Sequence, residues 1–209
     1  MDNLFKHTTQ FSFELSNICN LISVHKKCPL HIDAIGDYKK QILPTKIIEQ
    51  TIDVLAENGF SGNVCFSIYN EPTNDPRLIY IIKYIKDKLG SRGRTFVISN
   101  GYYLNEEFIQ DLHSLGLDIL WISAYSDADY RYFTTIKIPP TLQYYVRPHV
   151  PLDDRLDIYD SPPSGCIEPC GAPLGQICIR CNGDVILCCQ DWKSTTVFGN
   201  IKEKPIDEI

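Results

Sequence analysis

Predicted strands and helices alternate along the first two thirds of this chain, and that alternation constrains its fold more than any other feature. Short runs of apolar or alternating residues predict strands over 11–16, 63–69, 95–99 and 118–124. Helical spacing and end residues such as Pro, Asn and Gly predict the helices between them, over 43–60, 75–89 and 105–116. Such a series builds a parallel sheet, because each helix carries the chain back to the start of the next strand.

The pattern changes toward the C-terminus. No clear helix is expected over 125–140, and residues 142–150 predict a fifth strand. Residues 160–165 have the Pro, Ser and Gly composition of a linker. Beyond them, residues 176–189 predict a hairpin that turns at Asn182-Gly183, a strong two-residue turn signal. We therefore expect a parallel βα core followed by a cysteine-rich hairpin module.

Cysteine is unusually frequent in this chain. Nine of the 209 residues are cysteines, and six of the nine fall between Cys166 and Cys189. A separate pair, Cys19 and Cys28, lies in the stretch CNLISVHKKCPLH just after the first predicted strand. The N-terminal stretch MDNLFKHTTQ lacks the apolar segment of a signal peptide, so we expect a cytoplasmic protein. Disulfides are rare in that reducing compartment, and clustered thiols there indicate metal or redox sites.

The overall charge narrows the set of partners. A net charge of −6 and an isoelectric point near 5.3 disfavour a protein that binds nucleic acid or a membrane surface. No apolar run reaches the length of a membrane-spanning helix. We expect neither nucleic acid nor membrane as a partner.

Four stretches, in matching order over about residues 11–201, resemble radical S-adenosylmethionine enzymes. FELSNICNL resembles their entry strand and first cluster cysteine, and VCFSIYNEPTNDPRL resembles the strand that ends in a Gly-Gly-Glu-Pro element. VISNGYYLNEEFIQDLHSLGLDILWISAY resembles the later part with a Thr-Asn-Gly turn and a Ser-ended strand. CGAPLGQICIRCNGDVILCCQDW, with FGNI after it, resembles the start of a SPASM-type auxiliary iron–sulfur module.

The resemblance implies an α/β fold of the partial (β/α) barrel type. It divides the chain into a radical S-adenosylmethionine core over 8–155, a shortened barrel of about five parallel strands, and a SPASM-like cysteine-rich β-hairpin module over 160–209. It also implies two cofactors, a 4Fe-4S cluster held at the C-terminal mouth of the barrel and S-adenosylmethionine on the cluster's fourth iron. Reduction of the sulfonium then gives a 5′-deoxyadenosyl radical.

The same resemblance assigns cofactor-binding positions at the ends of the predicted strands. The positions that match the family's elements are Tyr69, Asn70, Glu71, Pro72, Ser99, Asn100, Ser123 and Arg147. Tyr69 and Asn70 stand where the family has two glycines, and Ser99 stands where it has threonine. Strand serines and surface arginines are common for other reasons, so Ser123 and Arg147 have equally simple structural interpretations.

The first cysteine loop departs from the family pattern Cys-x3-Cys-x2-Cys. It has Cys19 and Cys28 only, so a third cluster ligand has to be found. His25 and His31 each lie two residues from Cys28, on opposite sides, and both are candidates. Because Cys28-Pro29 resembles the end of the family loop, His25 is favoured. An imidazole ligand in place of a thiolate raises the cluster potential.

The C-terminal cysteines match only the first half of the auxiliary module. Cys170, Gly183 and Cys188 fit its spacing, whereas the later Cys-x2-Cys-x5-Cys part has no counterpart up to Ile209. An auxiliary iron–sulfur cluster would therefore draw on nearby thiols, which are Cys166, Cys170, Cys178, Cys181, Cys188 and Cys189. Four of these thiolates would equally suit a structural zinc ion. Cys65, inside an apolar strand, is interpreted as a core residue.

The family members with SPASM modules often modify ribosomally made peptides, and this implies a substrate peptide. The closest subtype in size and loop is the small splicease, which excises a tyramine unit at a Tyr-Gly site. We expect a small peptide-recognition partner protein and an external electron donor. Two alternatives stay open: a radical enzyme that acts on a sugar or other small molecule, and a catalytically degenerate metal-binding scaffold subunit.

Overall fold

The computed structural model describes residues 5–23, 28–30, 39–148 and 171–209. One eight-stranded sheet runs through them in the order β5-β4-β3-β2-β1-β6-β7-β8. Its strands are β1 (Gln10–Phe13), β2 (Gly62–Phe66), β3 (Gly93–Ser99), β4 (Leu117–Ala124), β5 (Gln143–Pro148), β6 (Gln176–Ile179), β7 (Asp184–Ile186) and β8 (Val197–Asn200). The first six strands in space, from β5 to β6, are parallel, and β7 and β8 are antiparallel additions.

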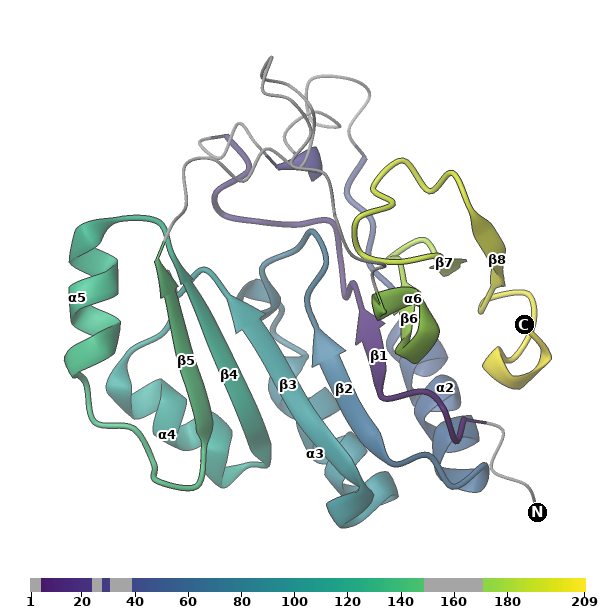
Figure 1. Cartoon of the computed structure of the whole chain (residues 1–209), viewed down its shortest axis with the longest axis horizontal. Coiled ribbons are helices and arrows are strands. Elements are labelled where there is room, and N and C mark those ends of the chain that lie inside the picture. Colours follow the sequence, from purple (N-terminus) through teal and green to yellow (C-terminus); the bar gives the residue numbers. More distant parts are fainter. Residues whose placement is uncertain (1–4, 24–27, 31–38, 149–170) are drawn as a thin grey trace.

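Helices cover one face of this sheet (Figure 1). The α-helices are α2 (Thr45–Glu57), α3 (Leu78–Leu89), α4 (Glu106–Ser114), α5 (Asp127–Thr135) and the short α6 (Ala172–Gly175), with 3-10 turns η1 (Pro72–Asn74), η2 (Gly90–Arg92) and η3 (Ile206–Glu208). No helix in the described residues is both long enough and apolar enough to span a membrane. The element order confirms the predicted α/β fold with a mostly parallel sheet.

Local sequence explains where the helices begin and end. The apolar stripe of α2 buries Ile48, Ile52 and Leu55 against the sheet, and Gly59 past its end takes a φ of +70° that favours glycine. Asn105 caps α4 by accepting a hydrogen bond from the backbone N–H of Phe108 at 2.8 Å. The predicted helices are therefore found, with ends that differ by a few residues.

The prediction of no helix over 125–140 is wrong. Residues 127–135 form α5, whose N-cap Ser126 accepts a hydrogen bond from the backbone N–H of Asp129. Only Phe133 of this helix is buried, so it has no apolar stripe that periodicity can detect. Capping and the acidic first turn are its only sequence signals.

The C-terminal hairpin is continuous with the core sheet. β6 and β7 pair antiparallel across the Asn182-Gly183 turn, and Gly183 has a φ of +95°. β6 also pairs with β1 in parallel, with Cys178 opposite Ser12. The parallel part of the sheet therefore has six strands where about five are expected, because a strand from the cysteine-rich region adds to its edge.

The two faces of the parallel strands differ. One face packs against the helices through the main hydrophobic core, which includes Phe11, Phe13, Val64, Phe66, Val97, Leu120 and Ile122. We call the opposite side the second face; by strand alternation it carries Ser12, Cys65, Phe96, Ile98, Ile119, Trp121, Ser123, Tyr145, Arg147 and Cys178. It holds only a small apolar cluster of Cys65, Phe96 and Ile119 with Ile98 packed beside it.

Candidate functional site

The parallel strands end at one edge of the sheet, where the arrowheads of β1 to β5 in Figure 1 point. The loops after β1, β2 and β3 bring Cys19, Glu71 and Asn100 to this edge. Ser123 lies near the end of β4 and Arg147 near the end of β5, and the two residues are register partners. Loops at the carboxyl ends of parallel strands are where sites form in α/β folds.

The carboxylate of Glu71 organises this edge. Its side chain is 2% exposed and accepts hydrogen bonds from the Ser99 hydroxyl at 2.7 Å, the Asn100 backbone N–H at 2.7 Å and the Thr73 backbone N–H at 3.0 Å. Burial raises the pKa of Glu71, and these donors act in the opposite direction by stabilising the charged form. These donors belong to the loop after β2 and to the end of β3 with the loop that follows it, so the carboxylate holds the two loops together.

The first cysteine loop is fastened to the same network. The backbone N–H of Glu71 donates to the carbonyl of Ile18 at 3.1 Å. The side-chain amide of Asn100 donates to the Asn20 carbonyl oxygen at 2.8 Å, and its nitrogen lies 3.8 Å from the sulfur of Cys19. Three consecutive parallel strands therefore fix the position of Cys19.

Cys19 is a half-buried thiol with a strongly perturbed pKa. Burial raises the pKa of Cys19 to about 11, and the backbone N–H of Leu21, 3.4 Å from the sulfur, offsets part of this. The charges of Glu71 and Cys28 raise it further, which places the Cys28 thiol in the same neighbourhood. A thiol of this kind is protonated at neutral pH and loses its proton when it binds a metal.

Several buried amide atoms at this edge lack a hydrogen-bond partner. Both polar atoms of the Asn70 side chain and the side-chain nitrogen of Asn20 are buried without a partner in the described protein. Such atoms are rare in folded proteins and indicate a bound polar group. Together with the Cys19 thiol, they fit a cluster and a polar cosubstrate at this edge. His25 and His31 lie outside the described residues, and among the described ones no group of three or more His, Cys, Asp or Glu is arranged around a metal position.

The side chain of Tyr69 links the strand-end edge of the sheet to the C-terminal region. Its hydroxyl donates to the backbone carbonyl of Cys189, and the guanidinium of Arg180 lies 5.1 Å from the centre of its ring. The preceding Ile68 has a φ of +84°, a left-handed conformation that is strained for a β-branched residue. The strain lies in the turn that links β2 to Tyr69 and Glu71.

An ion pair that sequence reasoning missed lies beneath this link. Glu14 is fully buried and accepts a 2.8 Å hydrogen bond from the guanidinium of Arg180 and a 3.0 Å bond from the backbone N–H of Cys181. Glu14 follows β1 and Arg180 follows β6, so the pair closes the junction between these strands. Its only sequence signal is that Glu14 is the one charged residue in the alternating stretch FSFELS.

The C-terminal thiols fall into two environments. Cys178 lies on the second face, where burial raises its pKa to about 12 and the neighbouring Cys189 and Cys188 raise it further. Cys65 is also on this face; burial raises its pKa to about 12, and Cys178 and Cys189 contribute. We call Cys178, Cys188 and Cys189 the sheet thiols, and the core residue Cys65 lies beside them. Cys166 and Cys170 lie outside the described residues.

Cys181 does not join the sheet thiols. Burial raises its pKa, and the next contributions come from Glu14, not from another cysteine. Cys178 lies within β6, whereas Cys181 lies in the turn between β6 and β7, which explains their different surroundings. The predicted Cys-x2-Cys pair is therefore divided between two places.

Ser123 and Arg147 have few contacts. Ser123 is half-buried, and Arg147 is exposed and makes no hydrogen bond or ion pair with the described part of the chain. Their side chains share the second face. The structure therefore brings them toward the strand-end site without showing what they bind.

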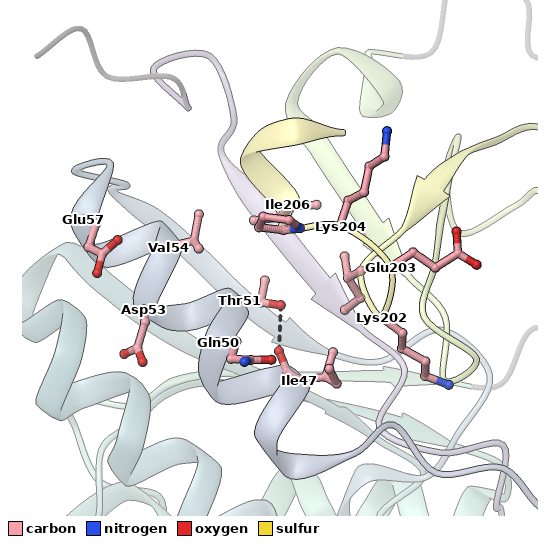
Figure 2. A pocket seen from close by; sticks show the side chains of 12 residues that line it. Ile47, Gln50, Thr51, Asp53, Val54, Glu57, Lys202, Glu203, Lys204 and Ile206 are labelled. Carbon is pink, nitrogen blue, oxygen red and sulfur yellow. Dashed lines mark hydrogen bonds between the residues drawn. The ribbon is translucent and has the colours of Figure 1, made fainter.

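A separate hollow lies on the helix side of the molecule, between α2 and the segment before η3 (Figure 2). Its volume is about 390 Å³. Asp53 and Glu57 line one side of it, and Lys202 and Lys204 line the other. None of the predicted site residues lines this hollow, so it is distinct from the strand-end site.

Comparisons with known proteins agree with this architecture. Residues 170–209 match the SPASM family, described as an iron–sulfur cluster-binding domain. The S-adenosyl-L-methionine-dependent 2-deoxy-scyllo-inosamine dehydrogenase of Niallia circulans is 22% identical over 216 residues, which cover all of this chain and 83% of the relative.

Solved structures show the same fold. The crystal structure of BtrN in complex with AdoMet and 2-DOIA has a TM-score of 0.80 at 21% identity, over 100% of this chain and 82% of that one. Streptococcus suis SuiB bound to precursor peptide SuiA has a TM-score of 0.54 at 12% identity, over 96% of this chain and 64% of that one. The SPASM match and these likenesses support the predicted 4Fe-4S cluster and S-adenosylmethionine as cofactors.

Proposed function

We propose that this chain is a radical S-adenosylmethionine enzyme whose first cluster is held by the loop after β1. The observation that carries the proposal is the network in which Glu71 and Asn100 fix the Cys19 loop at the strand ends. A buried carboxylate used in this way makes the loop rigid before any ligand binds. Pre-organisation of this kind is what a site with demanding geometry needs.

The residues present have distinct tasks in this proposal. Cys19 and Cys28 hold iron, with His25 or His31 as the third protein ligand. The side-chain nitrogen of Asn20 and the whole side-chain amide of Asn70, which have no partner in the described protein, complete the polar surface around the cosubstrate. When bound, the cluster and S-adenosylmethionine supply a 5′-deoxyadenosyl radical that removes a hydrogen atom from the substrate.

Ser123 and Arg147 complete the proposed site on the side of β4 and β5. A hydroxyl and a guanidinium that pairs with no described residue lie on adjacent strands and suit hydroxyl or carboxylate groups of a ligand. The carboxylate of Glu71 already accepts hydrogen bonds from protein donors. It therefore positions the loops and is not assigned a proton-transfer role. Pro72 is the first residue of the turn η1 and directly follows Glu71, so its ring fixes the backbone next to that carboxylate.

The sheet thiols are proposed to hold a second metal. The match of residues 170–209 to an iron–sulfur cluster-binding domain supports an auxiliary cluster, and a zinc ion is the alternative. The described thiols do not by themselves surround a metal position, so the proposal draws on Cys166 or Cys170 as well. Tyr69 and Arg180 connect this region to the strand-end site. Cys166 and Cys170 stay candidate ligands, and Cys181 is the weakest candidate because of its separate surroundings.

Two substrate classes follow from the relatives. A ribosomal peptide is supported by the likeness to SuiB bound to its precursor peptide. Excision of tyramine from such a peptide stays a prediction. A small molecule is supported by the likeness to the inosamine dehydrogenase, which extends over the whole of this chain. A partner protein, an external electron donor and a cytoplasmic location stay predictions.

The test is anaerobic reconstitution of the full chain, followed by reduction in the presence of S-adenosylmethionine. We expect 5′-deoxyadenosine to form, and Cys19→Ala and Cys28→Ala each to abolish it. Cys65→Ala is the matched control, because that thiol lies in the small apolar cluster of the second face and is not assigned to either metal site. Wild-type cleavage in either loop variant contradicts the ligand assignment, and an inactive but metal-loaded wild type favours the degenerate scaffold.

A further inference from the structure

A row of aromatic side chains lies on the second face of the sheet. It is nearer to the N-terminal ends of the strands than Ser123 and Arg147 are. Ile98, Trp121 and Tyr145 are register partners on β3, β4 and β5. The ring centres of Trp121 and Tyr145 are 5.7 Å apart, and those of Phe96 and Trp121 are 5.0 Å apart, in edge-to-face pairs. The row is therefore a continuous apolar platform, not a set of separate side chains.

The platform is exposed although its residues are large and apolar. Trp121 is 40% exposed and Tyr145 is 51% exposed, whereas Phe96 beneath them is 5% exposed. Folding usually buries aromatic rings of this size, and exposed contiguous ones mark contact sites. Because this face leads directly to the strand-end site, the natural occupant is the substrate of that site.

The charge around the platform selects among substrates. The second-face positions of the described strands β1 to β6 carry two arginines, Arg94 and Arg147, and no acidic residue. Arg94 donates to Gln143 at 2.7 Å, and Arg147 makes no such bond to described residues. Glu14, just beyond β1, is already neutralised by Arg180. A basic face in a chain of net charge −6 favours an anionic ligand.

Resting on the proposed function, the geometry points to a small, ring-bearing anion as the substrate of this enzyme. Its ring stacks on Trp121 and Tyr145, and its carboxylate or phosphate pairs with Arg147. Arg147 lies two residues after Tyr145 on the same strand and face, which is a spacing of about 7 Å along the strand. This is the separation between a ring and an acidic group on a short side chain. An amine substrate meets an uncompensated guanidinium on this face and is disfavoured.

Four matched probes separate the contributions of ring and charge. Isothermal titration of the reconstituted full chain with 3-phenylpropionate, 3-phenylpropanamide, 3-phenylpropylamine and hexanoate should rank 3-phenylpropionate first. We expect the amide to bind about tenfold more weakly and hexanoate about fivefold more weakly, with no binding of the amine. Equal affinity for the acid and the amide, or preference for the amine, overturns the inference.

Two variants assign these preferences to residues. Trp121→Leu should weaken 3-phenylpropionate about fivefold and leave hexanoate unchanged, and Arg147→Gln should abolish the preference for acid over amide. Phe198→Leu is the control, because Phe198 is an aromatic residue on β8 that is more exposed (58%) than Trp121 and lies outside the strands β3 to β5. Loss of binding in all three variants, or in neither of the first two, overturns the inference.

Two further readouts complete the test. N-acetyl-Gly-Phe-Gly-amide presents the same ring on a peptide, and tighter binding of this peptide than of 3-phenylpropionate overturns the assignment to a small anion. Cleavage of S-adenosylmethionine in the same preparations tests the proposed function by itself. Cleavage without probe selectivity removes only the substrate assignment, and selectivity without cleavage removes the enzyme assignment.

Discussion

The two cysteine regions of this protein are built in opposite ways. In the loop after β1, Cys19 is fixed by groups from neighbouring strand ends, above all Glu71 and Asn100. In the C-terminal region, Cys178 lies within a strand of the sheet and faces other thiols. The first arrangement depends on polar contacts between loops, and the second on strand pairing. Cysteine spacing alone does not tell which thiols meet, since Cys178 lies within β6 and Cys181 lies in the turn that follows it.

The two regions nevertheless share a junction, and breaking it is expected to have the largest effect. Arg180→Met leaves the Glu14 carboxylate buried without its charged partner. We expect the free energy of unfolding to fall by about 3–5 kcal/mol, as when one member of a buried ion pair is removed. Chemical denaturation of the full chain measures this. Lys88→Met, which breaks the exposed pair with Asp53, serves as the control and should change little. Equal effects of both variants would show that the junction is not a stabilising feature.

The next largest effect on stability is expected in the hydrogen-bond network around Glu71. Glu71→Gln places an amide NH2 group against donors such as the backbone N–H of Asn100, so we expect a loss of about 2 kcal/mol in unfolding free energy. Ser99→Ala removes one donor and keeps the carboxylate, so its loss should be smaller, about 1 kcal/mol. A larger loss for Ser99→Ala than for Glu71→Gln would contradict the role given to the carboxylate.

The pH dependence of stability tests the same carboxylate. Because burial raises the pKa of Glu71 above its ordinary value of 4.5, the folded protein binds the proton more tightly than the unfolded chain. The contribution of Glu71 to stability is therefore greatest below pH 4.5 and falls as the pH rises toward the raised pKa. Glu71→Gln should remove this slope in denaturation curves measured between pH 4 and 8. An unchanged slope would mean that Glu71 does not titrate as the structure implies.

A smaller effect distinguishes thiols within the C-terminal region. Cys188→Ala should lower the metal content of reconstituted protein, because Cys188 acts on Cys178 electrostatically. Cys181→Ala should leave the metal content unchanged, because Cys181 lies beside Glu14 and not beside a thiol. Metal analysis of both variants decides this, and the reverse result would restore the Cys-x2-Cys pair as a metal site.

The smallest expected effect lies in the first loop. His25→Cys should keep the cluster and lower its reduction potential, because thiolate replaces imidazole, while His31→Ala should be mild. A redox titration followed by electron paramagnetic resonance measures the shift. If His31→Ala destroys the cluster and His25→Ala does not, the third ligand is His31.

Much of the parallel core could be predicted because its signals are local. The cap Asn105 and the glycine after α2 mark helix ends that the structure confirms. α5 was missed because its one buried side chain, Phe133, makes no periodic pattern. The addition of β6 beside β1 depends on pairing over more than 160 residues, which no local pattern encodes.

The candidate site was predictable to the same extent. Strand ends in a parallel sheet share an edge, so Cys19, Glu71 and Asn100 could be expected to meet there. The Glu14–Arg180 pair and the sheet thiols could not, because they depend on where β6 enters the sheet. The aromatic row of Trp121 and Tyr145 depends on the register of β4 and β5, which is also a tertiary property.

The central claim is that the first loop and the C-terminal thiols are two separate metal sites. The most direct measurement is electron paramagnetic resonance of the reduced Cys19→Ala/Cys28→Ala double variant, with and without S-adenosylmethionine, together with its iron and zinc content. The account predicts that the double variant loses the signal that S-adenosylmethionine perturbs and keeps the metal of the sheet thiols. Loss of all bound metal, or a surviving signal that still responds to S-adenosylmethionine, would contradict it.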